Sequence, residues 1–144
     1  MRNYVLTALV SLVVGGLLVF GFSTLNSSSV QENDAKAAKT AVLGYLEALK
    51  KGDAKGVCSS FSQGTITSNW QSLKACVTYL KTEFAKGPQL DAKATFEVTT
   101  VAFFTGPIGT VAEVKVLYTP QGPPSYEPIY LIKENEGFKI ELSS

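Results

Sequence analysis

Hydrophobic and polar positions change their period along the chain, and the first half has the period of helices. Apolar residues recur at three- and four-residue steps between residues 34 and 51, which predicts a helix with one buried stripe: Ala38, Ala41, Val42, Tyr45, Leu46 and Leu49. Asn33 or Asp34 can cap its start, and Gly52 ends it. Asp53 then caps a short second helix that runs to about Phe61.

A third helix is predicted after a loop. The segment SQGTITS, residues 62–68, has the composition of a loop. Ser68 to Gln71 then has the spacing of a capping box, and Gly87-Pro88 marks the end of the helix. The residues at helical spacing predict this buried face: Trp70, Leu73, Val77, Leu80 and Phe84.

After Leu90 the period changes to two, which predicts strands. In the first strand Phe96, Val98 and Ala102 alternate with polar residues that include Thr95, Glu97 and Thr99. The second strand places these residues on one face: Ala112, Val114, Val116 and Tyr118. The segments SYEPIYLIKE and GFKIELS predict two more strands, the last with Phe138, Ile140 and Leu142 facing inward. Helices followed by a meander predict an α+β domain, with three helices packed on a curved four-stranded antiparallel sheet.

The N-terminal segment is apolar enough to cross a membrane. Residues 5–22 carry no charge, and neither an A-x-A cleavage pattern nor a cysteine follows them directly. We therefore expect a membrane anchor at residues 1–23, a polar linker at 24–33 and a domain at 34–144. The alternative for the first segment is a signal peptide, which would leave the domain secreted after cleavage. The early positive charge keeps the N-terminus in the cytoplasm and places the domain outside it.

Charge and composition exclude several classes of function. From Val30 onward twelve lysines balance twelve acidic residues, and the single arginine is Arg2, so a nucleic-acid partner is not expected. The chain has no histidine, and the spacing of its two cysteines suits no zinc site, so neither a metal nor a cofactor is predicted.

Carboxylates give no clear sign of catalysis. Asp34, Asp53 and Asp91 fall at predicted helix starts or in a connection, where caps and turns explain them. Glu97 and Glu113 are expected in a solvated lattice of charges on the polar face of the sheet, together with Lys115, Lys139 and Glu141. We therefore predict that the protein is not an enzyme.

The two cysteines form an even pair in a domain that we expect to be exported. A disulfide between Cys58 and Cys76 would join the second and third predicted helices. The alternative is a pair of buried free thiols, because cysteine is also a common small core residue.

The passage AVLGYLEALKKGDAKGVCSSF resembles the nuclear transport factor two-like (cystatin-like α+β) superfamily. The matching residues, at the end of the first helix and the start of the second, are Tyr45, Ala48, Leu49, Gly52 and Asp53. The ending EGFKIEL is similar to the last strand of that family, and the resemblance covers residues 35–142. It implies a cone between helices and sheet, used by isomerases and cyclases and by non-catalytic domains. It also implies a secreted or membrane-anchored bacterial member, or a relative of the scaffold domains of type IV secretion.

Aromatic residues are the candidates for lining that cone. The ones we expect there are Tyr45, Trp70, Phe96, Tyr118 and Tyr130. They could form a pocket for a small apolar ligand or simply fill the core. We predict a membrane-tethered domain that binds a protein partner or dimerises through its sheet; the alternatives are a carrier of an apolar ligand and, less favoured, a cone-type isomerase. An open cavity with an isolated carboxylate would favour the ligand-binding alternatives.

Overall fold

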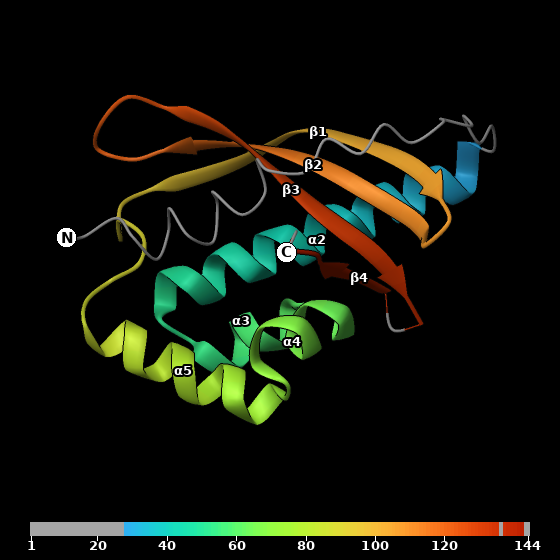
Figure 1. Ribbon diagram of the computed structural model, residues 1–144. Helices are drawn as coiled ribbons and strands as arrows, with labels where there is room; N and C mark the ends of the chain where they lie inside the picture. Colours follow the sequence, from blue (N-terminus) through green and yellow to red (C-terminus); the bar gives the residue numbers. More distant parts are fainter. Residues whose placement is uncertain (1–27, 136, 143–144) are drawn as a thin grey trace.

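The computed structural model describes residues 28–135 and 137–142 (Figure 1). The predicted membrane segment, residues 5–22, lies outside this part of the chain. No helix within the described ranges is long and apolar enough to cross a membrane. The described residues form an α+β domain in which helices pack on one face of an antiparallel sheet.

The first described helix, α2 (Ser28–Lys51), carries the predicted apolar stripe. Val42 and Leu49 from this stripe are almost fully buried. The helix already includes Ser28, the first described residue, so residues 28–33 are helical where a linker was expected. Asp34 therefore does not act as the cap. Its carboxylate instead accepts hydrogen bonds from the Lys133 Nζ atom at 2.8 and 2.9 Å.

The break between the first two helices is confirmed. Gly52 has φ +69°, a left-handed conformation that glycine adopts without the steric cost of a side chain. Asp53 caps α3 (Ala54–Ser60), because its side chain accepts a hydrogen bond from the Gly56 backbone nitrogen at 3.0 Å.

The predicted loop at residues 62–68 is wrong, because this segment begins α4 (Gln63–Trp70). Ser62 caps the helix by accepting a hydrogen bond from the Thr65 backbone nitrogen at 2.9 Å. Thr65 and Ile66 are buried, at 1% and 4% exposure. This burial outweighs the low helix propensity of the glycine and β-branched residues, so the described residues contain four helices and not the three predicted for the domain.

The predicted capping box at Ser68–Gln71 is also wrong. Gln71 ends α4 in a left-handed conformation with φ 66°, and Ser72 caps the next helix, α5 (Leu73–Ala85). On α5 Leu80 is buried, whereas Leu73, the first residue of the helix, is 46% exposed. Trp70 belongs to α4 and not to this helix.

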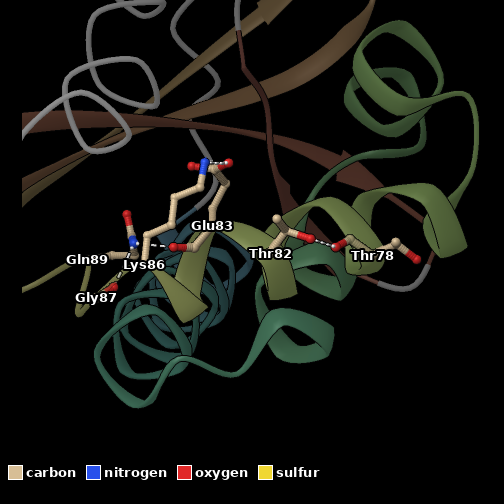
Figure 2. Close-up of polar contacts among 6 residues, drawn as sticks. All are labelled: Thr78, Thr82, Glu83, Lys86, Gly87 and Gln89. Carbon is tan, nitrogen blue, oxygen red and sulfur yellow. Dashed lines mark hydrogen bonds and ion pairs between the residues drawn. The ribbon is translucent and has the colours of Figure 1, made fainter.

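The C-terminal end of α5 is closed by side-chain contacts, which Figure 2 shows. The Gln89 amide nitrogen donates to the Glu83 carbonyl at 3.3 Å and to the Gly87 carbonyl at 2.9 Å. Lys86 forms an ion pair with Glu83 one turn before it. The Gln89 amide thus adds a side-chain donor to carbonyl groups at and just beyond the end of the helix.

The sheet is a meander with the order β1-β2-β3-β4. Its strands are β1 (Thr95–Gly106), β2 (Gly109–Thr119), β3 (Ser125–Glu134) and β4 (Gly137–Ile140). In Figure 1 α2 runs along one face of the sheet; α3 packs against α2, α5 packs against α3, and α4 packs against α5. We call the face of the sheet towards α2 the inner face and the other the outer face.

A β-bulge in β1 overturns part of the predicted strand pattern. The register shifts between Val98, opposite Val116, and Thr100, opposite Lys115. The extra residue reverses the alternation, so Val101 is paired with the buried Val114 and lies on the inner face. Ala102 lies on the outer face, opposite Glu113, and not beside Phe96 and Val98 as predicted.

The other inward-facing predictions are confirmed. On β2 the buried residues are Ala112, Val114 and Val116, and near the C-terminus they are Phe138, Ile140 and Leu142. The last strand also forms an isolated parallel β-bridge between Ile140 and Phe61. In this bridge the Ser62 nitrogen donates a hydrogen bond to the Ile140 carbonyl at 2.8 Å. This β-bridge holds the connection between α3 and α4 against the edge of the sheet.

Candidate functional site

A cavity of about 160 Å³ lies between α2 and the inner face of the sheet. Most of its wall is apolar, from side chains of α2, the segment after α5, the strands and the C-terminal segment: Leu46, Leu49, Leu90, Val116, Ile129 and Ile140. Phe96 and Tyr118 form an aromatic wall, with ring centroids 5.5 Å apart and planes inclined by 23°. A cavity of this kind suits a small molecule with a large apolar part.

Four of the five aromatic residues predicted to line the cone border this cavity: Tyr45, Phe96, Tyr118 and Tyr130. Trp70 does not. It stacks on Phe61 at a centroid distance of 5.4 Å and lies 6.3 Å from the ring of Tyr79. The reason is the helix α4, which was not predicted and which carries Trp70 to the far side of Phe61.

Tyr130 borders the cavity from the sheet, but its hydroxyl serves the outer face. Its register partner is Glu113, which lies between the inward-facing residues Ala112 and Val114. Burial raises the pKa of Tyr130, and the charge of Glu113 and a hydrogen bond to its carboxylate raise it further. The Tyr130 phenol is therefore engaged on the outer face, and its backbone carbonyl accepts a hydrogen bond from the Glu141 nitrogen at 2.8 Å.

Tyr45 contributes a buried polar group to the cavity. Its side chain is only 6% exposed, and burial raises its pKa. Among the described residues no hydrogen bond to its hydroxyl is formed, and no side-chain oxygen or nitrogen that is fully enclosed there lacks a partner. The Tyr45 hydroxyl is therefore not fully enclosed by the protein, and because Tyr45 borders the cavity, its hydroxyl can donate a hydrogen bond to a molecule bound there.

Glu127 is a second polar group of the cavity, and the sequence analysis missed it. It is paired with Val116, which is buried on the inner face, so its side chain also belongs to that face. In the described part of the chain its carboxylate takes part in no hydrogen bond or ion pair. Counting back in steps of two from the inward-facing Leu131 would have placed Glu127 inside the cone.

Glu141 also borders the cavity, but its carboxylate is occupied. It accepts a hydrogen bond from the hydroxyl of Ser62, the buried cap of α4. The predicted lattice of charges is therefore only partly formed. Glu113 lies 3.9 Å from Lys115, whereas Lys139 donates to the Ser59 carbonyl and Glu141 turns to Ser62.

The disulfide prediction is confirmed: Cys58 of α3 and Cys76 of α5 are joined, and both are fully buried. Asp53 and Asp91 have the structural roles expected of them. Asp91 accepts hydrogen bonds from the backbone nitrogens of Lys93 and Gln121, which ties the connection before β1 to the loop before β3. Within residues 28–135 and 137–142, no group of three or more potential metal-ligating side chains is found.

No family model and no curated protein matches the chain. Among solved structures, the chain is similar to a candidate dehydratase of the NTF2-like (nuclear transport factor two-like) family from Streptomyces avermitilis. The two are 11% identical with a TM-score of 0.44, and the match covers 76% of this chain and 92% of the other. This likeness is too weak to bear on function, so the site is judged from its own geometry.

Proposed function

We propose that the protein is a nuclear transport factor two-like domain that binds a small, largely apolar molecule in the cavity between α2 and the sheet. The observation that carries this proposal is the Tyr45 hydroxyl, which forms no hydrogen bond within the described residues and belongs to a side chain that borders an apolar cavity of about 160 Å³. This donor is free to bind an acceptor on a ligand, and such a hydrogen bond contributes about 0.5–1.5 kcal/mol.

The size of the cavity limits the ligand. An engineered apolar cavity of about 150 Å³ in another protein binds benzene, so the cavity described above suits a molecule with one ring or a short chain. Drug-sized ligands occupy pockets of roughly 300–1,000 Å³, so only part of such a molecule would fit inside this cavity. The predicted carrier of a small apolar ligand therefore becomes our preferred function over partner binding in an assembly.

The disulfide supports a place for this domain outside the cytoplasm. Disulfides persist in oxidising compartments and are rare in the cytosol. We propose that the chain is held at the membrane by residues 5–22, or secreted after their removal, with the domain on the extracytoplasmic side. Binding to a protein partner and the absence of catalysis stay predictions.

The test is a titration of the ¹⁵N-labelled full chain with toluene and with benzyl alcohol, followed by nuclear magnetic resonance. Both probes are expected to shift the backbone amides of Leu46, Leu49 and Val116, and to leave those of the exposed face of α5 unchanged. If neither probe shifts the amides of cavity residues at its solubility limit, the proposed function is wrong.

A Tyr45→Phe variant sharpens this test. Benzyl alcohol has an oxygen that can accept from the Tyr45 hydroxyl, and toluene has none. The variant is expected to bind benzyl alcohol more weakly by about 1 kcal/mol and to bind toluene as before. Tyr79→Phe is the matched control, because Tyr79 is 48% exposed on α5 and away from the cavity.

A further inference from the structure

The charged groups around the cavity all have the same sign. Among the described residues that border it, Glu127 and Glu141 are acidic and none is basic. Away from the cavity, by contrast, Glu47, Glu83, Glu113 and Asp34 each have a lysine within 4.0 Å. A pocket lined by one sign of charge, with apolar walls, attracts molecules of the opposite charge.

The two carboxylates differ in whether they already accept a hydrogen bond from the protein. Glu141 accepts a hydrogen bond from the Ser62 hydroxyl and is held at the start of α4. Glu127 has no hydrogen-bond or ion-pair partner within the described residues, although it is half-buried on the inner face. Its carboxylate can therefore accept hydrogen bonds from a ligand without giving up a contact inside the protein.

Aromatic side chains lie next to Glu127 on the same face. Val116, its register partner, is two residues from Tyr118, whose ring stacks on Phe96. An ammonium group held by the Glu127 carboxylate would lie in the cavity that these rings border, and aromatic rings add cation–π attraction to an ion pair when the cation lies over a ring face. The apolar wall beyond these residues would hold the rest of the molecule.

We infer that the ligand of this cavity is a small organic cation, a primary or secondary amine with an apolar ring or chain, and that Glu127 binds its ammonium group. The inference rests on the proposed function, since it names the chemical class of the molecule bound in the same cavity. It excludes apolar carboxylic acids as ligands, because Glu127 and Glu141 would repel them.

Three probes of matched size test this inference: benzylamine, which is cationic at neutral pH, benzyl alcohol, which is neutral, and benzoate, which is anionic. Dissociation constants come from the amide shifts of the full chain. Benzylamine is expected to bind about tenfold more tightly than benzyl alcohol, as a hydrogen bond to a charged group would provide. Benzoate is expected not to bind, and added salt should weaken only the binding of benzylamine.

The variant Glu127→Gln keeps the shape of the side chain and removes its charge. It is expected to bind benzylamine and benzyl alcohol equally, with unchanged affinity for the alcohol. Glu97→Gln is the control, because Glu97 is exposed on the outer face, opposite Leu117, and this change should preserve the preference. The amide spectrum of each variant shows directly whether it is folded.

The failures of the two proposals can be told apart. If benzyl alcohol shifts the cavity residues but benzylamine binds no more tightly, or if the preference survives in Glu127→Gln, the cation inference is wrong and the binding function stands. If none of the three probes shifts the cavity residues, both proposals are wrong.

Discussion

The helical joint formed by residues 54–85 and the cavity beside α2 use their polar groups in opposite ways. In the joint, Ser62 and Thr65 are each only 1% exposed, and both have hydrogen-bond partners on the C-terminal segment. A buried disulfide crosses the same region. In the cavity, the Tyr45 hydroxyl and the Glu127 carboxylate have no partner within the described residues.

The difference separates groups that hold the fold from groups that are available to a ligand. A buried polar group with its partner in place contributes to stability, whereas one without a partner lowers it. Changes in the joint should therefore reduce the free energy of unfolding and leave ligand affinity alone. Changes in the cavity should alter ligand affinity and leave the free energy of unfolding at neutral pH nearly unchanged. The following experiments test whether stability and ligand affinity separate in this way.

Loss of the disulfide should have the largest effect on stability. Replacing both Cys58 and Cys76 by alanine removes a cross-link between two residues that lie 18 positions apart in the sequence. The free energy of unfolding in urea is expected to fall by about 3 kcal/mol, because the unfolded chain gains conformational freedom. Affinity for benzyl alcohol should be unchanged while the domain remains folded. A large loss of affinity in the folded variant would show that the joint and the cavity are coupled.

Removing the cap of α4 should have the next largest effect. Ser62→Ala deletes the acceptor for the Thr65 nitrogen and the donor to Glu141. The expected loss is about 1–2 kcal/mol of unfolding free energy, measured by urea denaturation. Ser72→Ala is the comparison, since Ser72 caps α5 with one hydrogen bond of 3.2 Å to the Ala75 nitrogen. Equal losses in the two variants would argue against a special role for the contact with Glu141.

Tyr45→Phe should have the smallest effect on stability at neutral pH. The free energy of unfolding is expected to stay unchanged or to rise by up to about 1 kcal/mol, because the hydroxyl has no partner to lose. At alkaline pH the ionisation of Tyr45 affects stability. Burial raises the pKa of Tyr45 above its unfolded value of about 10, so the folded chain binds more protons above that pH. Stability is therefore full below pH 10 and falls as the pH rises beyond it.

The control for this pH dependence is the same substitution at an exposed position. Urea denaturation between pH 8 and 11 should show a shallower alkaline loss for Tyr45→Phe than for the parent chain. Tyr79→Phe should leave the curve as it was. If Tyr45→Phe and the parent lose stability in parallel, the Tyr45 phenol is not buried in the way that the structure describes.

Several elements follow from the sequence because their causes are local. The helix up to Lys51, its end at Gly52 and the cap at Asp53 depend on side chains within a few residues of one another. Alternation likewise identified the inward-facing residues of β2. The cysteine pair was predicted because an exported chain with two cysteines has one possible intramolecular disulfide.

Other features arise only from long-range packing. Helix α4 forms in a segment of low helix propensity because contacts with the C-terminal segment bury and hold it, through Thr65 with the Leu142 nitrogen and Ser62 with Glu141. The bulge at residues 98–100 reverses the faces of β1, and a period of two cannot reveal such an insertion. Both features moved residues that the sequence analysis had placed: Trp70 away from the cavity and Ala102 to the outer face.

The chain by itself thus determined a helical stripe, a helix break, a disulfide and most of an antiparallel sheet, because each rests on neighbouring residues or on simple counting. The tertiary structure alone decided which polar groups at the cavity are left without a protein partner. Alternation from Leu131 places Glu127 on the inner face, but only the packed structure leaves the Glu127 carboxylate and the Tyr45 hydroxyl without a hydrogen bond or ion pair within the described residues. Strand register and side-chain packing are relations between distant residues, so the candidate site became visible only when the fold brought them together.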